Sequence, residues 1–175
     1  ALNAANVSNV STLTINGFSK AFAMTGWRVG YLCAPKEIDT AVLKIHQYGI
    51  MCAPTVSQYA AQYALQSGFE DDFAAVKEMR EEYNRRRRFV VNSFNEMGLT
   101  CFEPKGAFYV FPSVKSTGMT GDEFATRLLN EKEVAVVPGS AFGECGTYHI
   151  RASYATSMEK LSEAMERISS FLKTL

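Results

Sequence analysis

Cysteine and histidine are scarce and scattered in this sequence. Its 175 residues contain four cysteines and two histidines, and no two cysteines form a CxxC pair. A disulfide framework or a zinc ribbon needs such residues at close and repeated spacing. The sequence therefore predicts neither kind of site. We expect reduced and buried thiols, as is usual for free cysteine, at all four positions: Cys33, Cys52, Cys101 and Cys145.

An excess of charge and a long apolar run are also lacking. Lysine plus arginine number 18 and aspartate plus glutamate number 18, so no net charge attracts nucleic acid or an anionic membrane. No apolar run approaches the roughly 20 residues that span a bilayer, and the N-terminus lacks the order of a signal peptide. We therefore expect a cytoplasmic protein that binds neither nucleic acid nor membrane.

Hydrophobic residues make up 47% of the chain, enough for one domain or for a small domain plus part of another. In the first seventy residues, β-branched alternation and helical spacing of apolar residues predict two strands and two helices. Gly49 and Gly68 are expected to end the helices. The strands are expected at 12–16 and 27–33, and the helices at 36–47 and 56–66.

A longer helical pattern runs from Asp71 to Met97. At about 1.5 Å per residue this helix is ~40 Å long, which suits a strut that joins two domains. Four consecutive arginines, 85–88, interrupt its apolar stripe. Glu81 and Glu82 lie one turn earlier, so we interpret the run as helical ion pairs on a solvated face rather than as a nucleic-acid patch.

After Gly98 the pattern changes to short mixed elements typical of a compact α+β domain. Thr120 and Ser157 are placed to cap the helices that follow them. Strands are expected at 107–111, 134–137 and 148–154, and helices at 121–131 and at the C-terminal end.

Lys20 is the charged residue of an otherwise uncharged segment, 1–27, and it has Phe18, Phe22 and Met24 around it. A buried setting favours the neutral amine that imine chemistry requires. Arg28 lies eight residues further on, and its planar fork of donors suits a phosphate dianion.

Gly26 and Gly30 flank Arg28 in the sequence. Because glycine has no Cβ, we expect the backbone to approach a ligand closely on either side of Arg28.

The stretch SKAFAMTGWRVGY resembles the cofactor-lysine motif of the class I and II aminotransferases, which are fold-type-I pyridoxal-phosphate enzymes related to aspartate aminotransferase. The resemblance implies that Lys20 forms a Schiff base with pyridoxal 5'-phosphate and that Arg28 binds the cofactor phosphate. Many family members carry a hydroxyl three positions before the lysine. Gly17 stands there in this chain, and Ser19 is the hydroxyl beside Lys20.

Two later segments extend the resemblance over nearly the whole chain. PKGAFY (104–109) is similar to a strand of the family's small domain, and VPGSAFG (137–143) followed by HIR (149–151) is similar to the loop and strand that carry the arginine for the substrate's α-carboxylate. The resemblance places that role on Arg151. Independently, an inward-facing arginine in the strand YHIRASY needs a partner, and a carboxylate is a suitable one.

The loop CAPTVS (52–57) resembles one that reaches a cofactor phosphate across a dimer interface in relatives. Thr55 and Ser57 are its candidate hydroxyls, and both also fit as ordinary helix caps.

The resemblance implies an α/β fold and the C-terminal part of a homodimeric enzyme. Residues 1–70 would end the large cofactor domain, and 71–175 would form the connecting helix and the small domain. The expected reaction is transamination between an α-amino acid and a 2-oxo acid, although the fragment alone is expected to be inactive. A fold does not fix a function, so a carbon-sulfur lyase or other enzyme of the same fold, and a non-catalytic binding or regulatory domain, remain alternatives.

Overall fold

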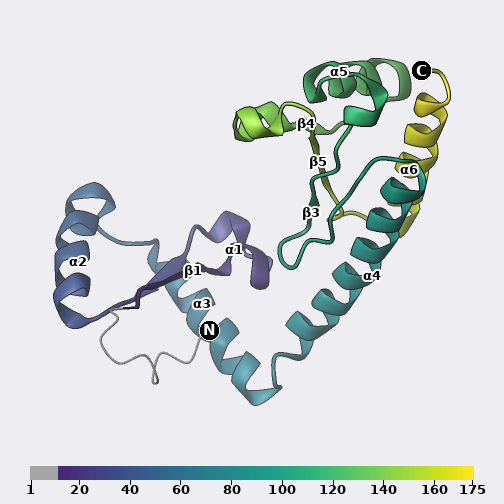
Figure 1. Cartoon of the computed structure of the whole chain (residues 1–175). Helices are drawn as coiled ribbons and strands as arrows, with labels where there is room; N and C mark the ends of the chain where they lie inside the picture. Colours follow the sequence, from purple (N-terminus) through teal and green to yellow (C-terminus); the bar gives the residue numbers. More distant parts are fainter. Residues whose placement is uncertain (1–11) are drawn as a thin grey trace. The chain divides into compact units, whose positions relative to one another are not determined.

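A computed structural model describes residues 12–175 of the chain (Figure 1). The chain divides into two compact units, the first ending at Lys77 and the second running from Glu78 to Leu175. Both units contain helices and short antiparallel strands. No helix in the described range is long and apolar enough to cross a membrane.

The first unit begins with an antiparallel pair of strands, β1 (Thr14–Gly17) and β2 (Gly30–Cys33). Both expected strands are confirmed, with shifted bounds. β2 begins later than expected because the preceding residues form the 3₁₀ helix η2 (Thr25–Trp27), and the short helix α1 (Phe18–Ala21) follows β1 directly.

Two longer helices follow, α2 (Lys36–Ile50) and α3 (Thr55–Glu70). The prediction that Gly49 and Gly68 end them is wrong, because both glycines lie inside the helices. A glycine costs a helix only about 1 kcal/mol relative to alanine, which neighbouring turns can offset. α2 ends instead at Ile50, and the next residue, Met51, leaves the helical region with a φ of 64°.

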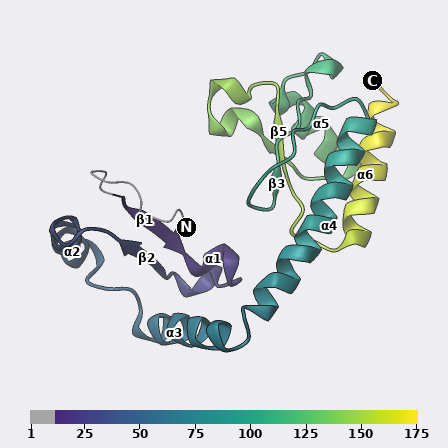
Figure 2. The ribbon, with the colours of Figure 1, turned by 60° about the horizontal axis from the view of Figure 1, so that its bottom comes forward.

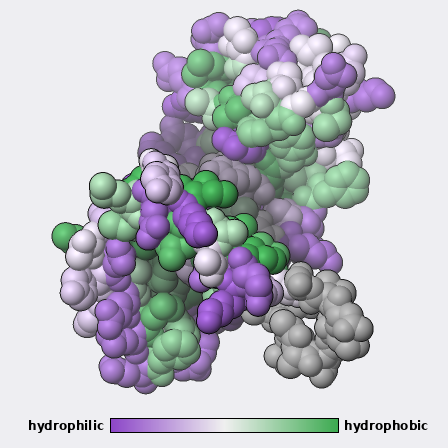
Figure 3. All heavy atoms as spheres, turned by 90° about the vertical axis from the view of Figure 1, so that its left-hand side faces the viewer, coloured by the Kyte–Doolittle hydropathy of each residue, from purple (hydrophilic) through white to green (hydrophobic). Residues whose placement is uncertain are grey.

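The described core of the first unit is small. It contains four buried hydrophobic residues, while many large apolar side chains of the same unit are exposed, and none of the α2 residues is buried. Hydrophobic atoms accordingly lie among hydrophilic ones at the surface in Figure 3. The exposed residues include Ile15, Ile45, Tyr48, Ile50, Tyr59, Tyr63 and Phe69.

The expectation that all four cysteines are buried is wrong. Cys33, Cys52 and Cys145 are exposed in this chain, and Cys101 is buried. Cys33 is the last residue of β2, Cys52 lies in the bend between α2 and α3, and Cys145 lies in a short 3₁₀ helix at 144–146. Burial raises the pKa of the Cys101 thiol to about 11, so this thiol is a structural rather than a reactive group.

The predicted long helix is present as α4 (Ala74–Glu96). The Asp71 carboxylate accepts a hydrogen bond from the Ala74 backbone N–H, at 3.4 Å. Asp71 therefore precedes the helix and contacts its first residue, rather than lying in its first turn. The ion-pair interpretation of the arginine run is confirmed for Glu82. Its carboxylate oxygens lie 2.9 Å from Arg85 Nε and 2.8 Å from Arg86 Nε.

The second unit contains a sheet with the order β3-β5-β4, formed by β3 (Tyr109–Val110), β4 (Val137–Pro138) and β5 (Ile150–Ser153). Both pairings are antiparallel. The expected strand at 134–137 is wrong in its bounds, because the ladder with β5 starts only at Val137.

Helices α5 (Gly121–Lys132) and α6 (Met158–Leu172) complete the second unit. The predicted caps are confirmed: Thr120 Oγ1 accepts from the Glu123 N–H at 3.2 Å, and Ser157 Oγ accepts from the Lys160 N–H at 3.3 Å. Short 3₁₀ helices connect the elements: η3 (Lys115–Thr117), η4 (Gly139–Phe142) and η5 (Glu144–Gly146).

The core of the second unit joins all of its long elements. Phe94 from α4, Phe124 from α5, Ile150 from β5 and Phe171 from α6 are all 0% exposed. α6 lies alongside α4 in both Figure 1 and Figure 2. This packing gives the β3-β5-β4 sheet a rigid support.

Candidate active site

The hairpin of the first unit brings Lys20 and Arg28 to one end of its ladder. Gly17 of β1 pairs with Gly30 of β2 at that end. Lys20 follows Gly17 by three residues, and Arg28 precedes Gly30 by two. Antiparallel pairing therefore places both residues beyond the same end of the two strands.

Of the two glycines beside Arg28, Gly30 is the one at which the structure shows close packing. A Cβ on Gly30 would lie 2.8 Å from the Asn16 carbonyl oxygen, whereas a Cβ on Gly26 would meet nothing within 4 Å. Gly30 therefore permits a close backbone contact within the chain, and the expected approach of the backbone to a ligand on either side of Arg28 stays a prediction.

Arg28 has an unusual backbone for a residue with a side chain. Its φ of 50° and ψ of 47° are left-handed, a conformation that costs such residues energy and often occurs at functional positions. Its Nη1 donates to the Thr25 carbonyl oxygen at 3.0 Å. This bond uses one of the five guanidinium N–H donors and orients the exposed fork.

Lys20 is exposed, so the expectation of a buried lysine is wrong for this chain. The apolar neighbours that suggested burial pack elsewhere: Phe18 and Met24 are buried in the core formed with α3, and Phe22 packs against that core. The one turn of α1 leaves Ser19 half-buried and Lys20 on the outer side. Residues 1–11 of the uncharged segment lie outside the described residues.

The loop before α3 does not use its hydroxyls as helix caps. α3 begins at Thr55, with Pro54 as its N-cap residue and no side-chain cap bond. Ser57 lies within the helix and is 5% exposed. The interpretation of Thr55 and Ser57 as caps is therefore wrong, and their contact with a phosphate remains a prediction.

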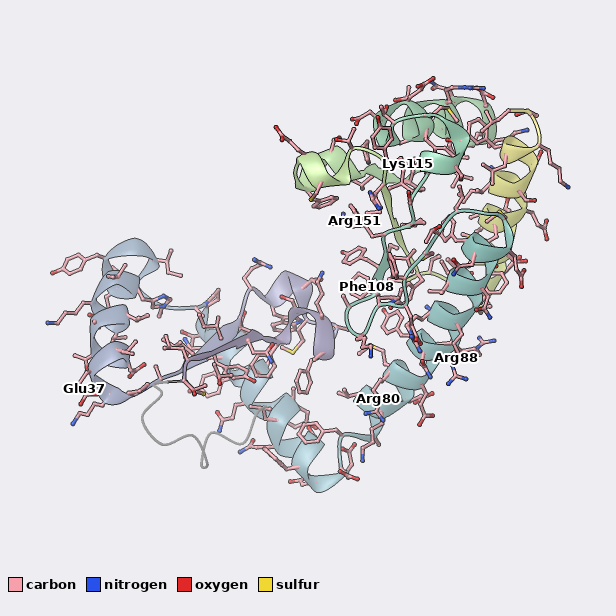
Figure 4. The ribbon with its side chains drawn as sticks, viewed as in Figure 1. Glu37, Arg80, Arg88, Phe108, Lys115 and Arg151 are labelled. Carbon is pink, nitrogen blue, oxygen red and sulfur yellow. The ribbon has the colours of Figure 1, made fainter. Side chains whose placement is uncertain are left out.

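Arg151 lies in the middle strand of the second unit's sheet, opposite Val137 of β4. Figure 4 shows it beside the turn that follows β4. Its guanidinium carbon lies 4.5 Å from the centre of the Tyr109 ring and 4.6 Å from that of the Phe142 ring. Arg151 is half-buried, and none of the carboxylates between residues 12 and 175 forms an ion pair with it.

The segment before β3 is held against β5 by Tyr154. The Tyr154 hydroxyl donates to the Ala107 carbonyl at 2.9 Å, and its backbone N–H donates to the Phe108 carbonyl at 2.9 Å. The Phe108 ring stacks on Tyr83 of α4 with their centres 5.8 Å apart. These contacts fix the strand that carries Tyr109.

The turn after β4 depends on two glycines in contact. The Gly139 N–H donates to the His149 carbonyl at 2.8 Å. A Cβ on Gly139 would overlap the Gly146 carbonyl oxygen and would lie 2.9 Å from the Phe111 ring. The turn can therefore close tightly enough to bring η4 next to β5.

Sequence reasoning did not single out Tyr109 and Phe142, although both lie inside the motifs 104–109 and 137–143. The signal that could have found them is the aromatic residue near the end of each of these two motifs. Lys20, Ser19 and Arg28 belong to the first unit and Arg151 to the second.

Comparison with known proteins identifies the family. A family model described as aminotransferase class I and II matches residues 1–168. An aspartate aminotransferase of Pyrococcus abyssi is 52% identical over 162 residues, which cover 93% of this chain and 41% of that protein. An aromatic-amino-acid aminotransferase of Thermococcus litoralis is 51% identical over 162 residues, with the same two coverages of 93% and 41%.

Solved structures agree with these relatives. The crystal structure of an aromatic aminotransferase from Pyrococcus horikoshii matches with a TM-score of 0.87 at 52% identity, over 93% of this chain and 43% of that one. The chain thus spans about two fifths of the length of the proteins that it matches. The predicted α/β fold of the pyridoxal-phosphate aminotransferases is confirmed over that share. This chain belongs to the class I and II aminotransferases, a pyridoxal-phosphate-dependent family.

Proposed function

We propose that this chain is part of an enzyme that transfers an amino group between an α-amino acid and a 2-oxo acid. The term complete enzyme denotes here a protein of the relatives' full length that contains this chain. The observation that carries the proposal is the hairpin end, where the exposed Lys20 and Arg28, with its oriented guanidinium, lie beyond the same end of the strand pair. In this proposal Lys20 binds pyridoxal 5'-phosphate covalently as the Schiff-base lysine, and Arg28 binds its phosphate.

The hairpin end fits this cofactor in its donor chemistry. A primary amine reacts with an aldehyde when it is accessible and neutral, and Lys20 is exposed. A phosphate dianion favours a planar, bidentate donor, and the Thr25 bond to Arg28 holds such a donor in one orientation. Ser19 directly precedes Lys20 and supplies a hydroxyl close to the same place.

Arg151 provides the complementary site for the amino acid. Its half-buried guanidinium has aromatic neighbours and no carboxylate partner among the described residues. A substrate α-carboxylate supplies the missing negative charge and can accept two parallel N–H bonds. We therefore assign the binding of the α-carboxylate to Arg151.

In the reaction, the cofactor supplies the electron sink that stabilises negative charge at the substrate Cα. Lys20 Nζ would take the proton from the substrate Cα as a general base and would later donate it as a general acid. Arg151 would hold the carboxylate and so limit the orientations that the bound amino acid can adopt. Arg28 keeps the phosphate end fixed throughout.

We further propose that residues 1–70 belong to the large cofactor domain and 71–175 to the connecting helix and the small domain. The complete enzyme would be a homodimer, as the resemblance implies, and we propose a cytoplasmic location for it. The apolar side chains exposed on α2 and α3 support burial of this surface in a larger assembly.

The test is transaminase activity of the complete enzyme with aspartate or an aromatic amino acid as donor and 2-oxoglutarate as acceptor. Lys20→Ala should lower kcat by about 10²- to 10⁴-fold, the usual contribution of an acid-base group. Lys44→Ala removes an exposed lysine of α2 and should leave kcat unchanged.

Arg151→Ala should raise KM for the amino acid by about 10- to 100-fold, because a charge-assisted contact is lost, and should leave cofactor binding intact. The proposal fails if Lys20→Ala keeps the wild-type kcat. It also fails if the enzyme, with no acceptor present, releases more than one molecule of 2-oxo acid per bound cofactor, because such continued release would indicate a lyase.

A further inference from the structure

The guanidinium of Arg151 lies over two aromatic rings that come from different elements. Tyr109 belongs to β3, and Phe142 is the last residue of η4, which follows β4. In the sheet order β3-β5-β4, β3 and β4 lie on opposite sides of β5, the strand that carries Arg151. The guanidinium carbon is almost equally close to both ring centres, at 4.5 and 4.6 Å.

The Phe142 ring is itself held in place by a second row of rings. It meets Phe111 edge-on with the centres 6.0 Å apart, and Phe111 stacks on His149 at 5.1 Å and 9° between the planes. His149 Nδ1 is buried and makes no hydrogen bond within residues 12–175. The histidine therefore contributes a flat ring face, and the row runs from His149 to Arg151.

General core packing does not account for this arrangement. Phe142 is 50% exposed, and Tyr109 is half-buried, so neither ring belongs to the buried core of the second unit. Rings that stay largely exposed contribute little hydrophobic burial to the stability of the fold. Their contact with a cation, however, is favourable, because a ring face carries negative charge density.

Aromatic contact also affects how a guanidinium can bind. Rings cover the flat faces of the group and leave the N–H donors, which lie in its plane, directed outward. Covering the faces removes water from them and restricts the side chain to few rotamers. A carboxylate that approaches in the plane then finds two donors already aligned, and less ordering entropy is lost on binding.

We propose that Tyr109 and Phe142 are positioning residues that hold the Arg151 guanidinium for the substrate carboxylate. This inference rests on the proposed function of Arg151. The two rings act through the arginine and do not need to touch the substrate. We refer to them as the Arg151 clamp.

The clamp predicts a specific change in the kinetics of the complete enzyme. Tyr109→Leu and Phe142→Leu should each raise KM for the amino acid by about 3- to 10-fold, the range expected for loss of one cation-π contact. The change in kcat should be smaller, and the absorbance of the bound cofactor should stay unchanged. Tyr109→Phe and Phe142→Tyr keep a ring and should retain the wild-type KM.

Phe102→Leu is the matched control, because Phe102 belongs to the same unit and is 84% exposed. It should leave KM unchanged. In an Arg151→Ala background, replacing either ring with leucine should raise KM no further. A merely structural role would instead add its effect to that of Arg151→Ala.

The outcomes separate the two proposals. If Arg151→Ala raises KM while both leucine variants keep the wild-type KM, the clamp is wrong and the function of Arg151 stands. If the leucine variants raise KM equally with and without Arg151, the rings do not act through the arginine and the clamp is also wrong. If Arg151→Ala itself leaves KM unchanged, the proposed carboxylate site is wrong.

Discussion

Gly139 and Gly146 touch each other's backbone at the turn that follows β4. A Cβ on either glycine would overlap the carbonyl oxygen of the other. The Gly139 N–H also bonds to the His149 carbonyl next to β5. At the scale of single residues, this contact determines where η4 lies, and η4 carries Phe142 to Arg151.

Gly139→Ala should therefore destabilise the second unit. The overlap is with backbone atoms, which cannot rotate away, and overpacking of this kind costs about 1–3 kcal/mol. Urea unfolding of the chain, followed by circular dichroism, measures the change. Gly106→Ala is the control, because a Cβ there meets nothing within 4 Å. Equal stability of the two variants would contradict the tight turn.

At the same scale, sequence reasoning found some features of the candidate site and missed others. The motifs singled out Lys20, Arg28 and Arg151 as candidates, because the resemblance to the family rests on those residue types in that order. The exposure of Lys20 was not predictable, since it depends on how the side chains of Phe18 and Met24 pack in the core that they form with α3. The ring contacts of Arg151 were also missed, because strand register and a 3₁₀ turn create them.

Among the elements, α4 contains an acid that bonds to two arginines. Hydrogen bonds from Arg85 and then Arg86 lower the pKa of Glu82 from 4.5 to about 2. A carboxyl whose pKa is lowered by folding stabilises the folded state above its unfolded pKa. It loses that contribution as the pH falls through the folded value.

Glu82→Gln should therefore lower the free energy of unfolding of the chain near neutral pH. The difference in this free energy between variant and wild type should shrink as the pH approaches about 2. The effect is modest because the ion pairs are solvated. Denaturant midpoints measured across that pH range test this. Glu81→Gln changes the neighbouring exposed acid, which has no ion pair within the described range, and serves as control. A Glu82 difference that is constant with pH would contradict the assignment.

Elements were predictable where local chemistry decides them. The caps at Thr120 and Ser157 are local hydrogen bonds, and both helices begin where the caps predict. Gly49 and Gly68 were poor guides, because a glycine in helical φ and ψ does not end a helix. The bounds of β4 depend on its pairing with β5, which sequence periodicity does not reveal.

At the scale of the whole molecule, the two units differ in how much core they contain. Within the described residues, the second unit's cluster has sixteen buried hydrophobic residues and the first unit's has four. The relatives are more than twice as long as the matched part of this chain. The unit that carries Lys20 and Arg28 is thus the one whose described core is small.

We therefore predict that the 175-residue chain by itself does not transaminate. A small core holds Lys20 and Arg28 less rigidly than catalysis requires, and the chain spans only 41% of its relatives' length. The chain is incubated with pyridoxal phosphate, an amino acid and a 2-oxo acid, and turnover is compared with that of the cofactor alone. Turnover above that background would contradict the prediction.

The central claim is that Lys20 is the residue that binds the cofactor. Borohydride reduction of the complete enzyme loaded with pyridoxal phosphate converts the covalent link into a stable amine, and peptide mass analysis locates it. We predict that the phosphopyridoxyl label lies on Lys20. Label on another lysine, such as Lys36 or Lys44, with Lys20 unmodified, would contradict the claim.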